Sequence, residues 1–196
     1  MFPSRKVTVG VMGSASGEFR PEVVEKCREV GRQIARHDCV IMTGACPGLP
    51  HHAVLGVRDE GGLIVGISPA LSLYEHVEYY HSPHAEYDVI IFTGSGLMGR
   101  EVAAIRSCDI VVIVGGRSGT LGEFAIAYDE GKLIGALLDT HGIADHVDEL
   151  VAMVNKKTEA EVIMDADPTA LIERCLKRHW EKVASGAYCH PPRRDG

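Results

Sequence analysis

The sequence predicts an α/β fold, a Rossmann-like three-layer sandwich with a mainly parallel sheet. Short runs rich in Val, Ile and Leu recur along the 196 residues, and Gly, Pro, Asp or Ser bounds each run, which is the pattern of strands. The runs are continuously apolar, so we expect both faces of every strand to be buried. Helical patterns separate the runs, and strands that alternate with helices form parallel sheets covered on both faces.

The expected elements alternate in order along the chain. Strands are expected at residues 7–12, 39–43, 63–67, 89–92, 110–114, 133–138 and 161–164. Helices are expected at residues 21–37, 49–60, 97–107, 120–130, 143–155 and 168–182. Pro21 and Pro168 stand where the first turn of a helix tolerates proline, and Asp165 or Asp167 can cap the last helix. Ligands of such folds bind outside the carboxyl ends of the strands, so we expect the loops that follow strands to contain the binding residues.

Two segments interrupt this alternation. Residues 68–88 are rich in tyrosine and histidine, have no clean periodicity and are longer than most connections, so we interpret them as a lid or an oligomer contact. The last residues contain two prolines and two arginines without apolar periodicity, which is typical of a mobile tail. We therefore expect one nucleotide-binding domain over residues 1–184 and a flexible tail over residues 185–196.

Composition and charge narrow the class of protein. The 45% of hydrophobic residues suffice for a buried core and argue against intrinsic disorder. No apolar run approaches the roughly 18 residues of a membrane span, and residues 1–6 lack the apolar stretch of a secretory signal, so we expect a cytoplasmic protein without a membrane partner. The net charge of −7 disfavours nucleic acid as a partner. The dispersed cysteines and histidines form no metal-binding motif, so we expect neither a metal nor another cofactor.

Four loops that follow expected strands contain glycine, at residues 10–17, 44–48, 94–96 and 115–120. Any one of them could be ordinary turn chemistry, because glycine permits positive φ and close backbone approach. The last loop, with the sequence Gly-Gly-Arg-Ser-Gly-Thr, runs straight into a helix, where free N–H groups and the positive helix end suit a phosphate. Its Thr120 adds a hydroxyl for the phosphate, or alternatively caps the helix.

Familiar nucleotide motifs are absent from the sequence. There is no Gly-X-X-X-X-Gly-Lys-Ser/Thr motif, which disfavours a P-loop NTPase. The first glycine loop lacks Gly-X-Gly-X-X-Gly, and the second strand ends in Thr43-Gly44 instead of the acid that would bind a ribose 2′-hydroxyl. NAD is therefore disfavoured as a ligand.

Five short motifs taken together carry a family resemblance. They are Met-Gly-Ser-Ala-Ser at residues 12–16, Thr-Gly to Gly-Leu at 43–49, Gly-Ile-Ser-Pro at 66–69, Arg100 nine residues before Asp109, and Gly-Arg-Ser-Gly-Thr-Leu-Gly-Glu at 116–123. This series resembles the LOG-like superfamily, which includes nucleoside 5′-monophosphate phosphoribohydrolases long labelled possible lysine decarboxylases, DprA-related proteins and molybdenum-cofactor carrier proteins. The resemblance covers residues 6 to about 130 and implies a Rossmann-like fold with a phosphate site.

Several positions depart from the catalytic branch of that superfamily. Its signature is Pro-Gly-Gly-X-Gly-Thr-X-X-Glu, preceded by an Arg-Lys pair on the previous helix, and residues 119–123 match the end of the signature. Gly115 stands where the signature has proline, and Arg117 replaces its second glycine. Arg100 matches the arginine of the pair, whereas Glu101 replaces the lysine. The fold and the phosphate site are thus better supported than hydrolase activity.

The resemblance also implies roles for individual residues. The residues expected to bind phosphate or nucleotide are Gly13, Ser14, Gly44, Gly116, Arg117, Ser118, Gly119 and Thr120. The expected catalytic residues are Glu123, which would stabilise an oxocarbenium-like state or orient water, and Arg100, which would hydrogen-bond the base or hold the phosphate. Alternatively, Glu123 is a first-turn acid that favours the helix dipole, and Arg100 is a surface arginine or a partner of Glu101 or Asp109.

Two further residues have competing interpretations. If residue 117 needs a positive φ, Arg117 carries backbone strain; otherwise its guanidinium adds a charged donor over the phosphate site. Cys46 is a small packed residue or a thiol of low pKa.

The leading hypothesis is a nucleotide-binding enzyme that hydrolyses a nucleoside 5′-monophosphate to free base and ribose 5-phosphate. The alternative is a carrier without catalytic activity that holds a nucleotide or molybdopterin. Binding of single-stranded DNA is disfavoured by the acidic charge. We also expect a homodimer or a dimer-built tetramer.

Overall fold

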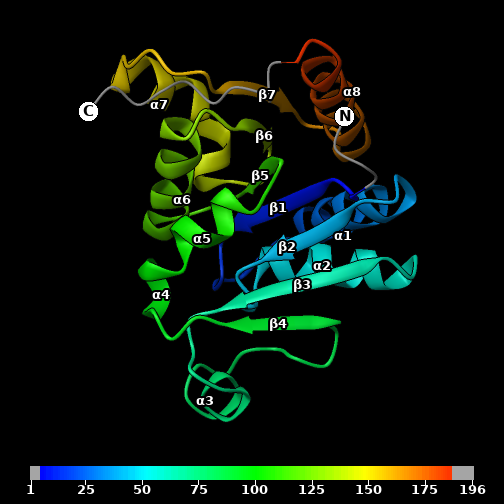
Figure 1. Cartoon of the computed structure of the whole chain (residues 1–196), viewed down its shortest axis with the longest axis vertical. Coiled ribbons are helices and arrows are strands. Elements are labelled where there is room, and N and C mark those ends of the chain that lie inside the picture. Colours follow the sequence, from blue (N-terminus) through cyan, green and yellow to red (C-terminus); the bar gives the residue numbers. More distant parts are fainter. Residues whose placement is uncertain (1–4, 187–196) are drawn as a thin grey trace.

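Seven parallel strands form one sheet in residues 5–186, the part of the chain that the computed structural model describes (Figure 1). The strands are β1 (Thr8–Gly13), β2 (Val40–Thr43), β3 (Leu63–Ser68), β4 (Val89–Phe92), β5 (Ile110–Val114), β6 (Leu133–Leu137) and β7 (Glu161–Asp165). Their order across the sheet is β4-β3-β2-β1-β5-β6-β7, and every neighbouring pair is parallel. The predicted fold class is confirmed.

Helices cover both faces of the sheet. They are α1 (Pro21–Arg36), α2 (Leu49–Asp59), α3 (Leu73–Glu78), α4 (Gly96–Gly99), α5 (Glu101–Arg106), α6 (Ser118–Asp129), the 3-10 helix η1 (Gly142–His146), α7 (Val147–Val154) and α8 (Pro168–Ala184). On one face α1, α2 and α8 bury a core with the sheet, while α5, α6 and α7 enclose a second core on the other face. Helix α1 packs against the sheet through one apolar face, since its buried residues Val23, Cys27, Val30 and Ile34 recur at helical spacing.

The strand order reverses between β1 and β5. Strand β1 pairs with β2 on one side and β5 on the other, and Gly13 at the end of β1 lies opposite Val114 at the end of β5. The chain leaves β1 toward α1 on one face and leaves β5 toward α6 on the other face. The two loops therefore diverge at this point, which is where ligands of open parallel sheets bind.

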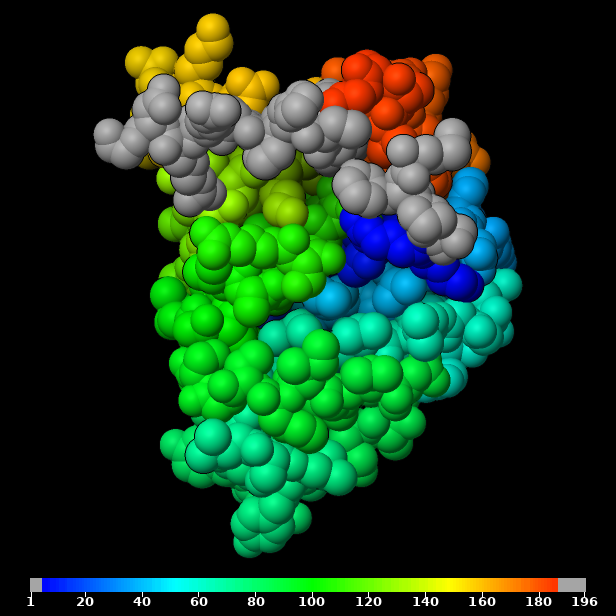
Figure 2. All heavy atoms as spheres, viewed as in Figure 1, coloured from blue at the N-terminus to red at the C-terminus, as the bar shows by residue number. Residues whose placement is uncertain are grey.

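Strand β4 differs from the expectation of strands buried on both faces. Val89 and Ile91 are each 48% exposed, whereas β5 and β6 are buried throughout. The reason is position, because β4 is an edge strand and none of its residues belongs to the core that α5, α6 and α7 enclose with the sheet. The expectation of two buried faces is therefore wrong for β4. Figure 2 shows that α3 and β4 form one end of the molecule, opposite α7 and α8.

Three helical segments differ in detail from the expected ones. The helix expected at residues 97–107 is divided into α4 and α5, which meet at Arg100. The segment 68–88, expected to be irregular, contains α3. The helix expected at residues 143–155 begins as η1 and continues as α7.

The end of the chain is described only in part. Asp167 caps α8, since its Oδ1 accepts a hydrogen bond from the Ala170 amide at 2.8 Å. Of the tail expected at residues 185–196, residues 187–196 lie outside the described residues. No helix within residues 5–186 is long and apolar enough to cross a membrane.

Candidate functional site at the start of α6

The first turn of α6 presents three backbone amides that the rest of the described chain leaves free. The helix begins at Ser118, and the amide of Leu121 is the first to bond back, to the Arg117 carbonyl at 2.9 Å. The amides of Ser118, Gly119 and Thr120 precede this bond and donate to no acceptor among residues 5–186. They lie at the positive end of a 12-residue helix, so this point favours an anion.

Thr120 is the third residue of α6 and not its cap. The cap position is Arg117, whose side chain makes no capping hydrogen bond. Thr120 is only 3% exposed, yet its hydroxyl has no hydrogen-bond partner among the described residues. The alternative that Thr120 caps the helix is therefore wrong, because the helix begins two residues earlier than expected.

Hydrogen bonds from two other loops hold the turn before α6 in place. The Gly116 amide donates to Ser14 Oγ at 2.8 Å, which ties the end of β5 to the end of β1. The Gly115 amide donates to Thr140 Oγ1 at 2.8 Å. Ser14, and Gly13 before it, thus support the turn from β1. Thr140 was not among the predicted site residues, although it comes just after β6 and so lies at the same edge of the sheet.

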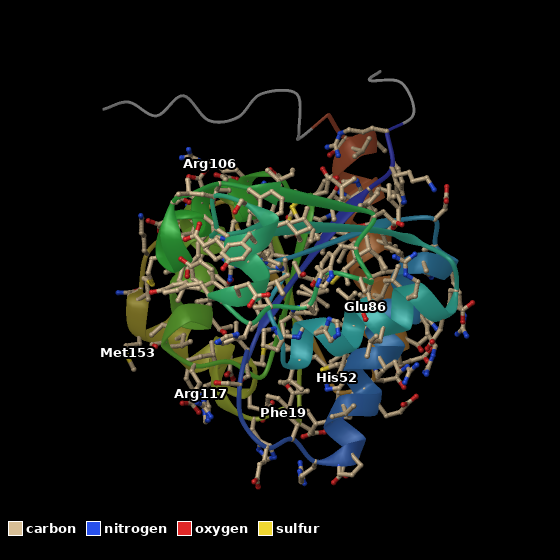
Figure 3. All side chains as sticks on the ribbon, turned by 90° about the horizontal axis from the view of Figure 1, so that it is seen from below. Phe19, His52, Glu86, Arg106, Arg117 and Met153 are labelled. Atoms are coloured by element: carbon tan, nitrogen blue, oxygen red, sulfur yellow. The ribbon has the colours of Figure 1, made fainter. Side chains whose placement is uncertain are left out.

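Arg117 adopts an extended backbone with φ −125°, so the interpretation of a strained residue is excluded. Its side chain is exposed and reaches across to the loop after β1, where Nη2 lies 3.1 Å from the position that a Cβ on Gly17 would take. Figure 3 shows Arg117 on the same side of the molecule as Phe19 of that loop. A permanently charged donor therefore flanks the three free amides of α6.

Arg100 is buried, with 7% of its surface exposed, and ties the ends of two strands together. Its Nη1 donates to the carbonyls of Gly44, after β2, and of Ile67, in β3, the latter at 3.0 Å. A Cβ at position 44 would lie 2.7 Å from Arg100 Nη2, so a larger residue there would displace the guanidinium group. Much of the donor capacity of Arg100 is therefore committed within the protein, and it is neither a surface arginine nor bonded to Asp109.

Two carboxyl groups lie beside Arg100. Glu101 is 7% exposed, and its Oε2 lies 3.2 Å from the position of a Cβ on Gly122 in α6. Burial raises the pKa of Glu101, and the charge of Arg100 opposes this rise. Burial also raises the pKa of Glu123 to about 8; the charge of Glu101 adds to this rise and that of Arg100 opposes it. Glu123 is thus extensively protonated at neutral pH.

Cys46 completes the surroundings of Arg100. Burial raises the pKa of its thiol, and the charge of Arg100 only partly opposes this effect. The thiol is therefore neutral at physiological pH, which agrees with a packed residue and not with a thiol of low pKa.

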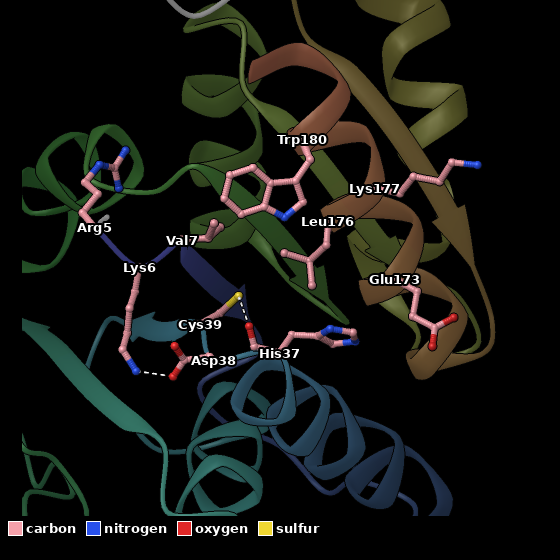
Figure 4. A pocket seen from close by; sticks show the side chains of 10 residues that line it. All are labelled: Arg5, Lys6, Val7, His37, Asp38, Cys39, Glu173, Leu176, Lys177 and Trp180. Carbon is pink, nitrogen blue, oxygen red and sulfur yellow. Dashed lines mark hydrogen bonds and ion pairs between the residues drawn. The ribbon is translucent and has the colours of Figure 1, made fainter. Parts of the chain in front are cut away.

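The other end of the sheet carries a separate groove of about 470 Å³. Figure 4 shows its lining, which comes from residues 5–7, the turn after α1 and helix α8, and includes Lys6, His37 and Trp180. None of the site residues expected from the sequence lines this groove. The expected residues instead gather at the carboxyl ends of β1, β2 and β5 and in the first turn of α6.

Comparisons with known proteins agree with this geometry. The model of the SLOG cluster4 family matches residues 6–172. An uncharacterized protein of Archaeoglobus fulgidus is 32% identical over 129 residues, covering 66% of this chain and 78% of that protein. The X-ray structure of the structural-genomics target TM1055 is 26% identical with a TM-score of 0.74, covering 88% of this chain and 99% of the other. The molybdenum cofactor carrier protein of Chlamydomonas reinhardtii is 27% identical with a TM-score of 0.71, covering 90% and 100%. The chain therefore belongs to the SLOG cluster4 family, in the LOG- and DprA-like superfamily that its motifs resemble.

Proposed function

We propose that this protein binds a phosphorylated small molecule, with the phosphate against the amides of Ser118, Gly119 and Thr120. The observation that carries the proposal is the set of three free amides at the start of α6, next to the hydroxyl of Thr120, which has no hydrogen-bond partner among the described residues. The first amides of a helix have no acceptor within the helix, and phosphate oxygens accept hydrogen bonds from such amides. Arg117 would add a charged hydrogen bond from the rim of the site.

The role that this site supports best is that of a carrier for a nucleotide or a pterin-type cofactor such as molybdopterin. Cleavage of an N-glycosidic bond needs a negative charge beside the developing oxocarbenium ion. Burial and the charge of Glu101 keep Glu123 extensively protonated near pH 7. Glu101 also stands where the catalytic relatives have lysine, and the molybdenum cofactor carrier protein of Chlamydomonas reinhardtii is similar in structure.

Hydrolysis of a nucleoside 5′-monophosphate is the second candidate. It is favoured by the position of Glu123, which is three residues after Thr120 and so within about 5 Å of it along the helix axis. A sugar attached to a bound phosphate would lie within reach of this side chain. Above pH 8 the carboxyl would be mostly ionised and could stabilise positive charge at C1′.

One experiment separates the two roles. The wild-type protein is incubated at pH 7 and pH 9 with a panel of nucleoside monophosphates, release of free base is measured, and binding is followed by calorimetry. The carrier role predicts binding that depends on the phosphate, without release of base. Release of base that falls on the order of 10²-fold in Glu123→Gln, with binding unchanged, would instead establish the hydrolase.

The exposed apolar surface at the β4 end supports self-association. Large apolar side chains that are at least 48% exposed there are Leu71, Leu73, Tyr74, Tyr79, Val89, Ile91, Leu97 and Met98. They come from the α3 region, the edge strand β4 and α4, which lie together in Figure 1. Contiguous apolar surface of this kind marks an interface in soluble proteins, and we propose a homodimer, alone or as the unit of a tetramer.

Light scattering at micromolar concentration tests the proposed assembly. Wild type should have at least twice the mass of the chain, and Ile91→Lys should shift the protein toward the monomer. Lys157→Glu, an exposed change outside this surface, serves as the control and should leave the mass unchanged. A monomeric wild type would contradict the proposed assembly.

A further inference from the structure

Glu101 and Glu123 form a pair of carboxyl groups against the first turns of α6. Besides its 3.2 Å approach to Gly122, the Glu101 carboxyl places Oε1 4.0 Å from the position of a Cβ on Gly119. Residues 119, 122 and 123 share one face of the helix, since they are three and four positions apart. The Glu101 side chain therefore lies on the face from which Glu123 projects. The two carboxyl groups are close enough for the charge of Glu101 to raise the pKa of Glu123.

This acidic pair has no hydrogen-bond donor within the described chain. Neither carboxyl accepts a hydrogen bond from any of residues 5–186. Arg100 contributes charge, but its Nη1 donates to the carbonyls of Gly44 and Ile67. The Glu101 residue is only 7% exposed, and a carboxyl group with little access to water is stabilised where another molecule supplies hydrogen-bond donors.

The pair lies close to the proposed phosphate position. Glu123 follows Gly119 by four residues, which is about 6 Å along the helix axis. A ligand whose phosphate contacts the first turn of α6 can thus extend along the same face of the helix. Its ring would meet the two carboxyl groups, with the charge of Arg100 and the neutral thiol of Cys46 nearby.

We propose, on the basis of the phosphate site proposed above, that Glu101 and Glu123 bind a ring edge with two adjacent N–H donors. The 2-amino-4-oxopyrimidine ring, common to guanine and pterins, has such an edge in its ring N–H and its exocyclic amino group. A carboxylate accepts two parallel N–H donors at once, and the second carboxyl group adds a further acceptor. Adenine has one amino donor beside a ring acceptor, so it matches the pair less well.

The test compares GMP, IMP, AMP and guanosine by calorimetry at pH 8.5 with wild type, Glu101→Gln, Glu123→Gln and Glu173→Gln. IMP lacks only the exocyclic amino group of GMP, while guanosine lacks only the phosphate. We expect wild type to bind GMP on the order of tenfold more tightly than IMP, because a buried acceptor is left unpaired with IMP. Glu101→Gln should reduce this ratio toward one, while Glu173→Gln, the same charge change on the exposed side of α8, should keep it.

Each outcome bears on a defined claim. Equal affinity for GMP and IMP, with guanosine still much weaker, would overturn the role of the acidic pair and leave the phosphate site standing. A GMP preference that persists in both Glu101→Gln and Glu123→Gln would also overturn it. Failure of every phosphorylated ligand to bind would overturn both proposals. Circular dichroism melting curves confirm that each variant is folded, so loss of discrimination in a folded Glu101→Gln protein supports the inference.

Discussion

The helices α2 and α6 both begin after glycine-bearing loops at the carboxyl edge of the sheet, yet their first turns are satisfied differently. In α2 the Leu49 amide donates to the Ser14 carbonyl at 2.9 Å, Pro50 has no N–H, and the His51 amide donates to the Gly48 carbonyl. In α6 the amides of the first three residues have no acceptor among the described residues. The first turn of α2 therefore has few free amides, whereas the first turn of α6 has three that can bind an anion.

A glycine loop before a helix is therefore not by itself an anion site. At α2 the loop serves the packing of the chain against β1, because Gly48 approaches the Ser14 carbonyl closely. At α6 the turn is held by its own Gly115 and Gly116 amides, so the amides that follow them remain free. The sequence signal that separates the two cases is Pro50, which removes a donor from the first turn of α2.

The largest expected effect concerns stability and separates the two helix starts. Gly48 has φ +89°, and a Cβ there would lie 2.1 Å from the Ser14 carbonyl oxygen. Gly48→Ala should therefore lower the free energy of unfolding by about 3 kcal/mol or more, measured by urea denaturation. Gly119→Ala is the matched variant at α6, where the nearest atom to a Cβ is 4.0 Å away, and it should change stability by less than about 1 kcal/mol. Equal losses in both variants would show that the two helix starts are equally constrained.

The second prediction concerns ligand affinity, and here the larger effect is expected at α6 and the smaller one at α2. Gly119→Asp places a carboxylate among the free amides of α6, so it should weaken binding of a nucleoside monophosphate on the order of 10²-fold by competing for the amides and repelling the phosphate. His52→Asp places the same group in the first turn of α2 and should change affinity less than about threefold. Calorimetry on the two folded variants measures both effects. A comparable loss of affinity in both variants would contradict the distinction between the two helix starts.

The smallest expected effect is a change in the pH dependence of stability. The folded pKa of Glu123, about 8, lies above its ordinary value of 4.5, so the folded protein holds a proton that the unfolded chain loses between these pH values. The contribution of this group to the free energy of unfolding therefore decreases as pH rises from about 4.5 to 8. Glu123→Gln removes this dependence, and its advantage over wild type should grow by on the order of 2 kcal/mol across that window, since solvent screens part of the effect. Parallel stability profiles for the two proteins would show that the carboxyl is not buried in this way.

The layers of the fold and all seven strands could be predicted from the sequence, because continuous apolar runs such as residues 110–114 are typical of strands buried on both faces. It was not sufficient for burial at the edge of the sheet, since the exposure of β4 depends on which strands pair with which. Helix α3 was missed although its start has a capping motif. The Ser72 hydroxyl accepts from the Glu75 amide, and the Glu75 carboxylate accepts from the Leu71 amide at 2.6 Å.

The residues of the site were predictable as a set, because the loops after β1, β2 and β5 meet at one edge of the sheet. The hydrogen-bond partners of the individual site residues could not be predicted. Arg100 is bonded to carbonyls 56 and 33 residues earlier in the chain, and no local pattern reports such contacts. Glu101 stood out only as a departure from the family's lysine, and its position against Gly119 and Gly122 became visible only in the folded chain.

A crystal structure of the protein grown with GMP would locate the phosphate, on which both proposed ligand contacts depend. We expect phosphate oxygens within about 3 Å of the amide nitrogens of Gly119 and Thr120, with the ring extending toward Glu123. A phosphate bound at the start of α2, or one that leaves the first turn of α6 without an acceptor, would contradict the account.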